Sequence, residues 1–514
     1  MPSSSIDHKE LAAVSPLVED FLYHFEKVRG FYAFSPRESA SYASAATALS
    51  YPGERRRALV EALAEQNPDQ PPLELLGRPG TCVVATGQQV GLLSGPAYTI
   101  YKALTAAKLA RQLTEQCIPS VAVFWLATED HDFAEIDHCW VFDAAHRPVR
   151  IESGGAAGPQ TPVGRIPVEG NPCGELRQAL KGLPFGDEVA GLAEEAYTSG
   201  RTYGEAFRIL LQRLLPSYGL LFLDPLQPAV RRLAAPLLSR AAENAAELVR
   251  SVLERNRELE SAGYHAQVHV DRESSLLFLL DEGKRLPLRI QSEALLAGRA
   301  ADLSPNALLR PVVQDYLLPT VASVLGPAEL AYMAQAQVLY GALLGRMPVA
   351  VNRASFTLAD ARASKLMKRY GLSLGDCVKG KEALGQRIAG TLIPPALERS
   401  LRETAAETEA RLERLTAELK SFDPTLAEAA LRSRRKILHQ IGKLGRKAGR
   451  ESLRRDARAV EEAEYLSALL HPEKELQERL YSILPFLAQH GLGLIDTIYE
   501  HVQPGQPDHQ LLTV

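Results

Sequence analysis

The stretch from Thr81 to Glu135 constrains the fold of this chain more than any other part of the sequence. Its first six residues, 81–86, are apolar or β-branched, which is typical of a short strand buried on both faces. A glycine-rich loop over 87–95 follows, and Pro96 favours the start of a helix that we expect to run to about Thr114. A second buried strand is predicted over 121–127. The order strand, glycine loop, helix, strand predicts an α/β fold.

Four ionisable residues directly follow the second predicted strand: Glu129, Asp130, His131 and Asp132. In open α/β sheets ligands bind at this carboxyl end of the strands. Four adjacent charges repel one another, so some must be solvated, paired with cations or shifted in pKa. We expect one of the four to act as a general base, and histidine is the side chain whose ordinary pKa is closest to neutral. The alternative is an acidic loop that caps the next helix.

A metal ion is a further alternative for this run, because Glu135 and His138 lie close by in sequence. The spacing matches neither HExxH nor a comparable ligand pattern. We therefore predict no metal site.

The glycine loop suits an anion, since the first turn of a helix has unpaired N–H donors and the positive end of the helix dipole. Its sequence is neither GxxxxGK[ST] nor GxGxxG, so neither an NTPase P-loop nor a dinucleotide fingerprint is indicated. Taken alone, the glycines are equally consistent with a tight turn. The helix that follows places Tyr98, Thr99 and Lys102 on one face, where Lys102 would balance the charge of a ligand. A solvated lysine on an amphipathic helix is the alternative.

Two further groups of polar residues lie in the second half of the predicted core. Gln314 and Asp315 follow Arg310 and Pro311, and a Gly-Pro boundary at Gly326 opens a helix that contains Glu329 and Tyr332. Glu329 lies in the first turn, where the helix dipole favours a carboxylate, so capping alone explains its position.

Composition limits the class of protein. The chain has 514 residues, enough for about three domains, and its 46% hydrophobic and 23% charged residues are typical of a soluble globular protein. A net charge of −4 gives no overall attraction to nucleic acid or to an anionic membrane, so neither is expected as a partner. The five cysteines are scattered and lack CxxC pairing, and the N-terminus has no apolar core of a signal peptide, which together predict a cytoplasmic protein.

Hydrophobic periodicity divides the chain into four parts. We predict a helical lead-in over 1–75, a core over 76–380 with insertions near 143–200 and 262–300, an antiparallel coiled-coil hairpin over 390–467, and a segment over 468–514 that packs back on the core. A pair of ordinary bundle helices is the alternative to the hairpin. Its second helix carries ten basic residues between Arg432 and Arg455, which indicates a solvated face or, as a minority interpretation, phosphate binding.

Inside the core the pattern predicts further elements. Strands are expected over 218–224, 266–270, 275–280, 285–290 and 349–352, with a turn at 281–284 between the third and fourth of these. One long helix is expected over about 229–259, and 304–345 is expected to be helical with an interruption at 325–327.

The motifs together resemble the cysteine ligase family of bacillithiol biosynthesis, the cysteine-adding enzyme of that pathway. The resemblance rests on Thr86–Lys102 (TGQQVGLLSGPAYTIYK) and Phe124–Asp132 (FWLATEDHD), both long enough to be specific. Arg310-Pro311 with Gln314-Asp315, Leu325–Glu329, and Asn352–Thr357 are similar to further motifs of the family, and the match covers nearly the full chain. The chain departs from the family pattern at Asn352, where relatives usually carry proline.

The resemblance implies a Rossmann-like core similar to class I aminoacyl-tRNA synthetases, with inserted connecting segments, a C-terminal coiled coil and a homodimer. The implied reaction joins cysteine to the amine of glucosaminyl-malate, with ATP expected for activating the carboxylate and Mg²⁺ possible beside it. No HxGH or KMSKS motif is present, so ATP rests on the resemblance. A synthetase-like nucleotidyltransferase for another substrate, or a non-catalytic coiled-coil adaptor, would fit the same pattern.

The resemblance also implies roles for individual residues. One of Glu129, Asp130, His131 and Asp132 would accept the proton of the amine. Substrate or nucleotide would be bound by Gln88, Gln89, Gly95, Tyr98, Thr99, Lys102, Arg310, Gln314, Asp315, Gly326, Glu329, Tyr332, Asn352 and Arg353.

Overall fold

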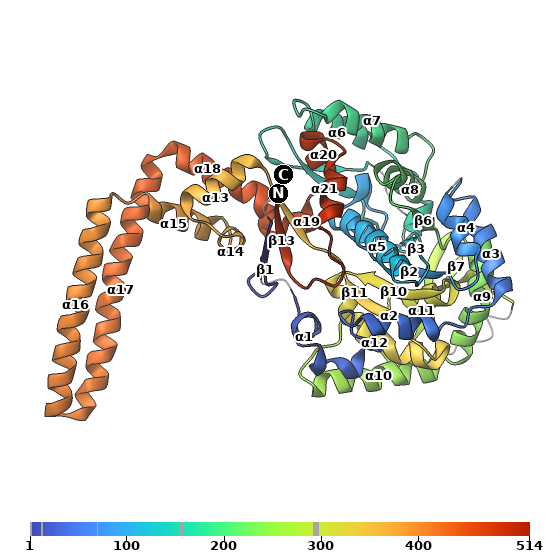
Figure 1. Ribbon diagram of the computed structural model, residues 1–514, viewed down its shortest axis with the longest axis horizontal. Helices are drawn as coiled ribbons and strands as arrows, with labels where there is room; N and C mark the ends of the chain where they lie inside the picture. The colour runs from blue at the N-terminus through green and yellow to red at the C-terminus, as the bar shows by residue number, and fades with distance from the viewer. Residues whose placement is uncertain (1–2, 12–13, 69, 155–157, 291–297) are drawn as a thin grey trace. The chain divides into compact units, whose positions relative to one another are not determined.

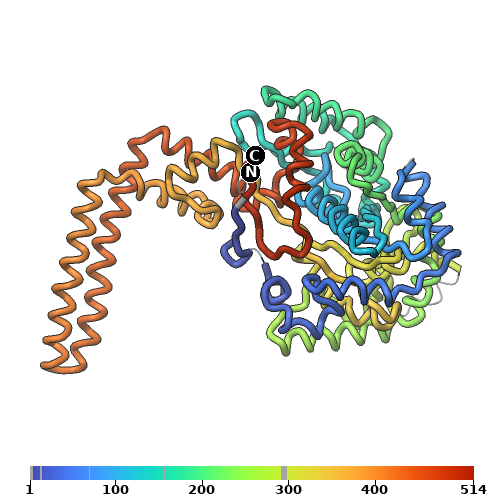
Figure 2. The backbone as a smooth tube through the Cα atoms, viewed as in Figure 1, coloured from blue at the N-terminus to red at the C-terminus, as the bar shows by residue number. Residues whose placement is uncertain are grey.

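The structure is a computed structural model that describes residues 3–11, 14–68, 70–154, 158–290 and 298–514. The chain divides into two compact units (Figures 1 and 2). The larger unit contains Ser5–Phe356 and Glu478–Gln510. The smaller unit contains Thr357–Gln477 together with the residues up to Ser4 and Leu511–Val514. Each unit is described by itself below.

A five-stranded parallel sheet forms the centre of the larger unit. Its order is β11-β10-β2-β3-β6, with β2 at Cys82–Gln88, β3 at Ser120–Leu126, β6 at Leu220–Leu223, β10 at Thr320–Leu325 and β11 at Val349–Asn352. From β2 the chain adds strands on one side, then returns to add β10 and β11 on the other. The order of strands therefore reverses between β2 and β10, and the crevice at the carboxyl ends of these two strands is where such sheets bind ligands.

The strands are buried because helices cover the sheet. Helix α5 (Tyr98–Glu115) packs against β2, β3 and β10, and α12 (Pro327–Leu344) packs against β11. The lead-in contributes β1 (Ser3–Ile6), α1 (Pro16–Tyr23), α2 (Ser39–Thr47), α3 (Gly53–Ala64) and α4 (Pro71–Gly77). Of these, α2 contacts β10 and β11, and α4 contacts β3 and β6, so the lead-in is part of the core of the larger unit.

Two stretches are inserted between strands of the sheet. Between β3 and β6 lie β4 (His138–Phe142), β5 (Pro148–Glu152), α6 (Pro172–Ala179), α7 (Gly186–Ala196) and α8 (Tyr203–Leu214). Between β6 and β10 lie α9 (Pro228–Glu243), α10 (Ala245–Ser261), β7 (Ser274–Asp281), β8 (Lys284–Arg289), β9 (Leu303–Pro305) and α11 (Arg310–Leu317). The predicted turn at 281–284 is confirmed, since Asp281 pairs with Lys284 across it in the β7–β8 hairpin.

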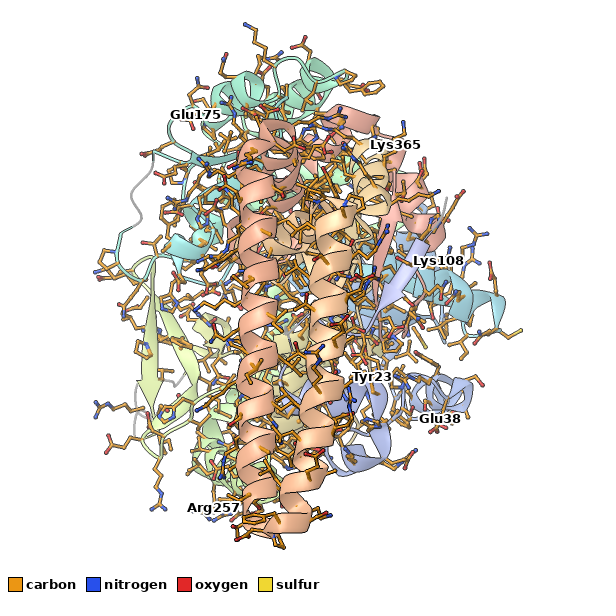
Figure 3. The ribbon with its side chains drawn as sticks, turned by 90° about the vertical axis from the view of Figure 1, so that its left-hand side faces the viewer. Tyr23, Glu38, Lys108, Glu175, Arg257 and Lys365 are labelled. Carbon is orange, nitrogen blue, oxygen red and sulfur yellow. The ribbon has the colours of Figure 1, made fainter. Side chains whose placement is uncertain are left out.

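The smaller unit is mostly helical. It holds α13 (Ala361–Tyr370), α14 (Leu374–Cys377), α15 (Lys381–Thr391), α16 (Pro395–Phe422), α17 (Pro424–Arg455) and α18 (Ala457–Leu470). The two long helices α16 and α17 lie side by side (Figure 3), joined at Asp423, whose side chain accepts the Thr425 N–H at 2.8 Å. Arg434 of α17 donates to Glu413 of α16 at 2.7 Å. The predicted two-helix hairpin is confirmed.

The remaining elements are β12, which precedes α13 in the sequence, and four elements from the end of the chain. They are α19 (Gln477–Leu480), α20 (Leu484–His490), α21 (Leu494–His501), β12 (Phe356–Ala359) and β13 (His509–Thr513), and a three-stranded sheet has the order β1-β13-β12. None of the helices in the described ranges is both long and apolar enough to span a membrane.

The expected helical pattern over 304–345 was wrong at its centre. Residues 320–325 form β10, a fully buried strand of the sheet rather than part of a helix. A short apolar run has the same composition in a buried strand as in a buried helix, so periodicity does not distinguish them. The register of β10 with β2 depends on residues more than two hundred positions apart in the sequence.

Two smaller predictions were also wrong. The single helix over 229–259 is two helices, α9 and α10, because Asn244 leaves the helical conformation and its side chain donates to the Arg240 carbonyl at 2.7 Å. Residues 266–270 form no strand. The side chain of Gln335 bonds both the N–H and the C=O of Val268, at 2.9 Å each, and so takes the place of a neighbouring strand.

The packing of β2 on β3 predicts the effect of a methyl group at Gly87. A Cβ there would lie 2.8 Å from the backbone oxygen of Trp125, which cannot move without breaking the register of the two strands. We expect Gly87→Ala to lower the free energy of unfolding by about 1–3 kcal/mol, measured as a lower thermal midpoint. Gly191→Ala is the matched control, because nothing lies within 4 Å of a Cβ at that helical position. Equal midpoints for the two variants would contradict this packing.

Candidate active site

The ammonium of Lys102 joins the two sides of the crevice between β2 and β10. It donates to the Gly87 carbonyl at 2.7 Å and to Gln88 Oε1 at 2.9 Å, both at the end of β2. It also forms an ion pair with Glu329, in the first turn of α12 directly after β10. Glu329 in turn accepts the Gly326 N–H at 2.7 Å, so the capping interpretation of Glu329 holds together with the ion pair.

Burial and mutual attraction shift the pKa of both groups in this ion pair. Lys102 is 2% exposed, and burial lowers its pKa although the Glu329 carboxylate opposes the shift. Burial disfavours the charged form of Glu329, but the positive charges of Lys102 and Arg310 outweigh it and lower the pKa of that carboxyl. The pair is therefore held ionised by mutual attraction in a place from which water is excluded. The alternative of a solvated Lys102 is wrong.

Arg310 lies at the more open edge of the same cluster. Its Nη2 donates to the Tyr332 hydroxyl at 2.6 Å and lies 3.8 Å from Glu329 Oε1. The Arg310 side chain keeps 21% of its exposure and that of Glu329 keeps 18%, whereas Lys102 keeps 3%. A ligand can therefore reach Arg310 and Glu329 directly.

Arg353, which directly follows β11, forms a second buried ion pair. Its guanidinium lies over the Tyr98 ring at 5.2 Å and bonds both carboxylate oxygens of Glu478, at 2.6 and 2.9 Å. Glu478 also accepts the Ser355 hydroxyl at 2.7 Å. No sequence signal identifies Glu478, because a single carboxylate 125 residues after its partner matches no motif.

The cluster carries an excess of positive charge. Lys102, Arg310 and Arg353 contribute three cations, while Glu329 and Glu478 contribute two carboxylates. The electrostatic effects of Arg310 and Arg353 both lower the pKa of Lys102, which shows that the three cations act on one another. The five groups therefore carry a net charge of +1, and Arg310 has the most exposed side chain of the three cations.

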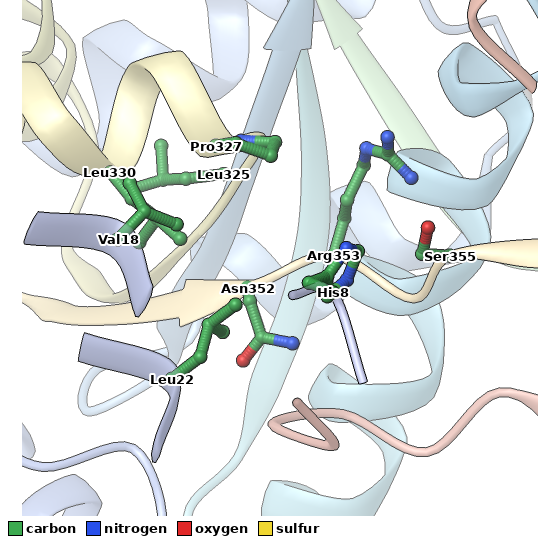
Figure 4. Close-up of a pocket in the computed structure, with 9 residues that line it drawn as sticks. All are labelled: His8, Val18, Leu22, Leu325, Pro327, Leu330, Asn352, Arg353 and Ser355. Carbon is green, nitrogen blue, oxygen red and sulfur yellow. The ribbon is translucent and has the colours of Figure 1, made fainter. Parts of the chain in front are cut away.

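Arg353 and Asn352 also border a cavity of about 20 Å³ (Figure 4). The cavity has room for roughly one water molecule and is too small for a substrate. The two side chains extend in opposite directions from the end of β11 (Figure 4). The amide of Asn352 donates to the Gln506 carbonyl at 2.5 Å, so the residue that departs from the family pattern fastens the C-terminal segment to the sheet.

The glycine loop does not form the predicted anion site with its backbone. The N–H groups of Leu92 and Leu93 donate to the Ile136 carbonyl at 3.0 Å and to the Tyr197 hydroxyl at 2.8 Å. The Ala97 N–H, at the entry to α5, donates to the Tyr481 carbonyl at 2.7 Å. These donors are used inside the protein, so phosphates or carboxylates at this edge of the sheet would be held by side chains.

Gly95 of the loop and the first residues of α5 lie next to the cluster. Gly95 adopts φ of +62°, which a residue with a Cβ rarely adopts. The Gln88 amide donates to the Tyr98 hydroxyl at 3.3 Å. Tyr98 lies one turn before Lys102 on α5. The buried hydroxyl of Thr99 has no hydrogen-bond partner among the described residues.

The four ionisable residues after β3 differ in burial and in their partners. Glu129 is buried and forms an ion pair with Arg231 of α9 at 2.8 Å; burial raises the pKa of Glu129, and Arg231 opposes the shift. Asp130 accepts the Gln89 amide at 3.1 Å. His131 Nδ1 lies 3.1 Å from the Arg285 guanidinium. Asp132 is exposed, and its carboxylate has no partner in the described part of the chain.

Gln88 and Gln89 connect the two groups of residues. Gln88 bonds Lys102 on one side, and its neighbour Gln89 bonds Asp130 on the other. Because β2 and β3 are adjacent and in register to their last residues, both groups lie at the same edge of the sheet. The sequence predicted this meeting of two strand ends, and the structure places it there.

Gln314 and Asp315 lie elsewhere. Asp315 is fully buried and binds the Tyr340 hydroxyl, and Gln314 donates to it at 3.2 Å. Burial raises the pKa of Asp315. The two residues hold α11 to α12 rather than reaching the crevice. In the ranges that the structure describes, no three His, Cys, Asp or Glu side chains are grouped as a metal site requires.

Comparison with known proteins gives a consistent family. Residues 1–354 match the model described as bacillithiol biosynthesis BshC, N-terminal Rossmann-like domain, and residues 356–514 match that of its C-terminal coiled-coil domain. A protein of Solibacter usitatus named "Putative cysteine ligase BshC" is 51% identical over all of both chains. Proteins of the same name from Koribacter versatilis and Salinibacter ruber are 36% and 30% identical, each over 98% of this chain and over 98% and 97% of their own.

The Arg353–Glu478 pair predicts how stability depends on pH. The Arg353 charge outweighs burial and lowers the pKa of Glu478 from 4.5 to about 2. A carboxyl with a lowered pKa stabilises the fold above its unfolded value, and this contribution is lost as the pH falls from about 4.5 toward 2, here roughly 3 kcal/mol. We expect Glu478→Gln to be less stable than the wild type at pH 7, with the difference shrinking below pH 4.5.

Thermal unfolding midpoints between pH 7 and pH 3 measure this difference. Glu500→Gln removes a carboxylate at an exposed position of α21 and serves as the control, with a difference from the wild type that stays small throughout. If the difference in thermal midpoint between Glu478→Gln and the wild type did not change with pH, the ion pair would not stabilise the fold.

Proposed function

The chain belongs to the BshC family of bacillithiol biosynthesis, and we propose that this ligase joins the carboxyl group of cysteine to the amine of glucosaminyl-malate. The product is an amide, and forming it would be the last step of bacillithiol biosynthesis. The proposal combines the family with the chemistry of the residues between β2 and β10.

The excess positive charge of the cluster supports an anionic substrate. The malate part of glucosaminyl-malate carries carboxylates, and guanidinium groups bind carboxylates through paired, charge-assisted hydrogen bonds. Arg310 is the cation of the cluster with the most accessible side chain, at 21%. This is the observation that carries the proposal: a reachable guanidinium at the point where the strand order reverses, backed by a buried ion pair that fixes its surroundings.

Amide formation places two further demands on the site. The cysteine carboxylate must be activated, and the amine must lose a proton as it attacks. We propose ATP as the source of activation, with its phosphates held at least in part by side chains, because the N–H groups of Leu92, Leu93 and Ala97 are already bonded. Asp132, at the end of β3, is exposed and ionisable and would accept the proton of the amine.

The smaller unit supports a proposal about assembly. Leu415, Phe422 and Leu444 are exposed on the hairpin, with 47%, 86% and 58% of their surface accessible. Apolar side chains at coiled-coil spacing on an exposed face suit a second helix pair. We propose that the hairpin joins two copies of the chain in the cytoplasm.

The reaction is tested with purified protein, cysteine and glucosaminyl-malate, with and without ATP, and mass detection of the amide. We expect product, and a decrease in kcat/KM of about 10- to 100-fold for Arg310→Gln, because a charge-assisted hydrogen bond contributes roughly 1.5–3 kcal/mol. Arg257→Gln, at an exposed position of α10 (Figure 3), is the control and should retain full activity.

The outcomes separate the alternatives. Turnover of ATP without use of cysteine would point to a nucleotidyltransferase for another substrate. No turnover by a folded protein that pairs through its hairpin would favour an adaptor. Full activity of Arg310→Gln would contradict the assignment of Arg310 to the substrate.

A further inference from the structure

The inserted hairpin β7–β8 brings an arginine to the end of β3. Arg285, the second residue of β8, lies with its guanidinium 4.0 Å from the centre of the Phe278 ring on β7. It donates to the Ser304 hydroxyl at 3.1 Å and to the Pro305 carbonyl at 2.7 Å. Three contacts from the small sheet β8-β7-β9 therefore hold the group in one place, and it is 8% exposed.

From this position the guanidinium contacts the ring of His131. Arg285 Nη1 lies 3.1 Å from His131 Nδ1 in hydrogen-bond geometry. A guanidinium carries only donors and keeps its proton in proteins. The Nδ1 atom of His131 must therefore be the acceptor, which leaves the ring neutral with its proton on Nε2.

The other groups around His131 leave its Nδ1 facing Arg285. Asp130 Oδ1 is 3.9 Å from Nδ1, beyond hydrogen-bond distance, and it accepts the backbone N–H of His131 itself at 2.7 Å. Phe278 packs against the ring with centroids 5.8 Å apart. Glu129, the other carboxylate that acts on Arg285, is engaged by Arg231. Proton uptake at Nδ1 would place two cations in direct contact.

We propose that Arg285 is a positioning residue that fixes His131 as a neutral hydrogen-bond donor, and that His131 is not the general base. The His131 side chain keeps 34% of its exposure, so a ligand at this edge of the sheet can reach the ring. This inference rests on the proposed function for its substrate. Nε2–H donates to the carbonyl oxygen of the activated cysteine, where negative charge develops as the amine attacks.

The proton balance of the step leaves His131 unchanged. The amine nitrogen bonds to the carbonyl carbon, the bond from that carbon to the phosphate leaving group breaks, and the phosphate departs with the electron pair. The amine proton passes to the carboxylate of Asp132. The Arg285–His131 pair thus performs the electrostatic part of catalysis, while the neighbouring carboxylate performs the acid–base part.

The tautomer is measured directly by NMR of the full chain labelled with ¹⁵N-histidine. The His131 signals are assigned by their loss in His131→Gln. We expect an unprotonated, pyridine-type Nδ1 and a protonated Nε2 in the wild type at pH 7. A protonated Nδ1, or rapid exchange between the two tautomers, would overturn the proposal. This experiment needs neither substrate nor nucleotide, so it decides the tautomer even if the proposed reaction is wrong.

Variants then test the role of Arg285. Arg285→Met should release the ring, so that His131 shows mixed tautomers and kcat falls about 10- to 100-fold with little change in KM. Arg289→Met replaces an exposed arginine four residues later on the same strand and is the matched control. It should leave the His131 tautomer and kcat unchanged. An unaltered His131 spectrum in folded Arg285→Met would show that Arg285 does not set the tautomer.

Kinetics separate a donor from a base at His131. Glutamine offers an N–H but cannot take up a proton at neutral pH, whereas alanine offers neither. We expect His131→Gln to keep kcat within about 10-fold of the wild type and His131→Ala to lose a further 10-fold or more. Equal, near-complete loss in both variants would identify His131 as the base and overturn the proposal.

Discussion

The ion pair between Lys102 and Glu329 is the constraint on which the rest of the structure depends. Moving an ammonium out of water costs several kcal/mol unless charge and hydrogen bonds replace the lost hydration. Here the replacement comes from both sides of the crevice: the end of β2 supplies the Gly87 carbonyl and Gln88, and the start of α12 supplies Glu329. The pair therefore joins the two strand ends, and Arg310 lies beside it with its Nη2 3.8 Å from Glu329 Oε1.

Segments far apart in the sequence complete this edge of the sheet. Glu478 fixes Arg353, and the hairpin β7–β8 delivers Arg285 to His131. Arg353, Glu478 and Arg285 are buried charges held by hydrogen bonds from other parts of the chain, so the site assembles as the fold forms. Polar groups held in place before the reaction need little reorganisation in the transition state. Such a preorganised site suits a ligase.

The sequence predicted the elements with strong local patterns. The strands β2, β3, β6 and β11, helix α5 and the hairpin of α16 and α17 follow from runs of apolar residues, from Pro96 and from heptad-like spacing. It also predicted that the ionisable residues after β3 lie at the carboxyl end of a buried strand, where such sheets bind ligands. It failed at β10, where a buried strand and a buried helix have the same composition, and at 266–270, where one glutamine side chain replaces a strand.

The charged residues that contact the site residues were beyond prediction for a different reason. Arg231, Arg285 and Glu478 are ordinary charged residues in their local sequence, and only the tertiary fold selects them as partners. The same holds for the loop amides, whose acceptors at Ile136, Tyr197 and Tyr481 no local motif reveals. Glycine and helix patterns show where an anion site is possible, and the fold decides whether its donors remain open.

The central claim is that the crevice between β2 and β10 binds the anionic substrate. A crystal structure of the protein with glucosaminyl-malate tests it most directly. The account predicts a carboxylate of the malate within hydrogen-bond distance of the Arg310 guanidinium, with the sugar amine toward the residues after β3. Ligand bound away from the carboxyl ends of β2 and β10, with Arg310 still directed only at Tyr332 and Glu329, would contradict it.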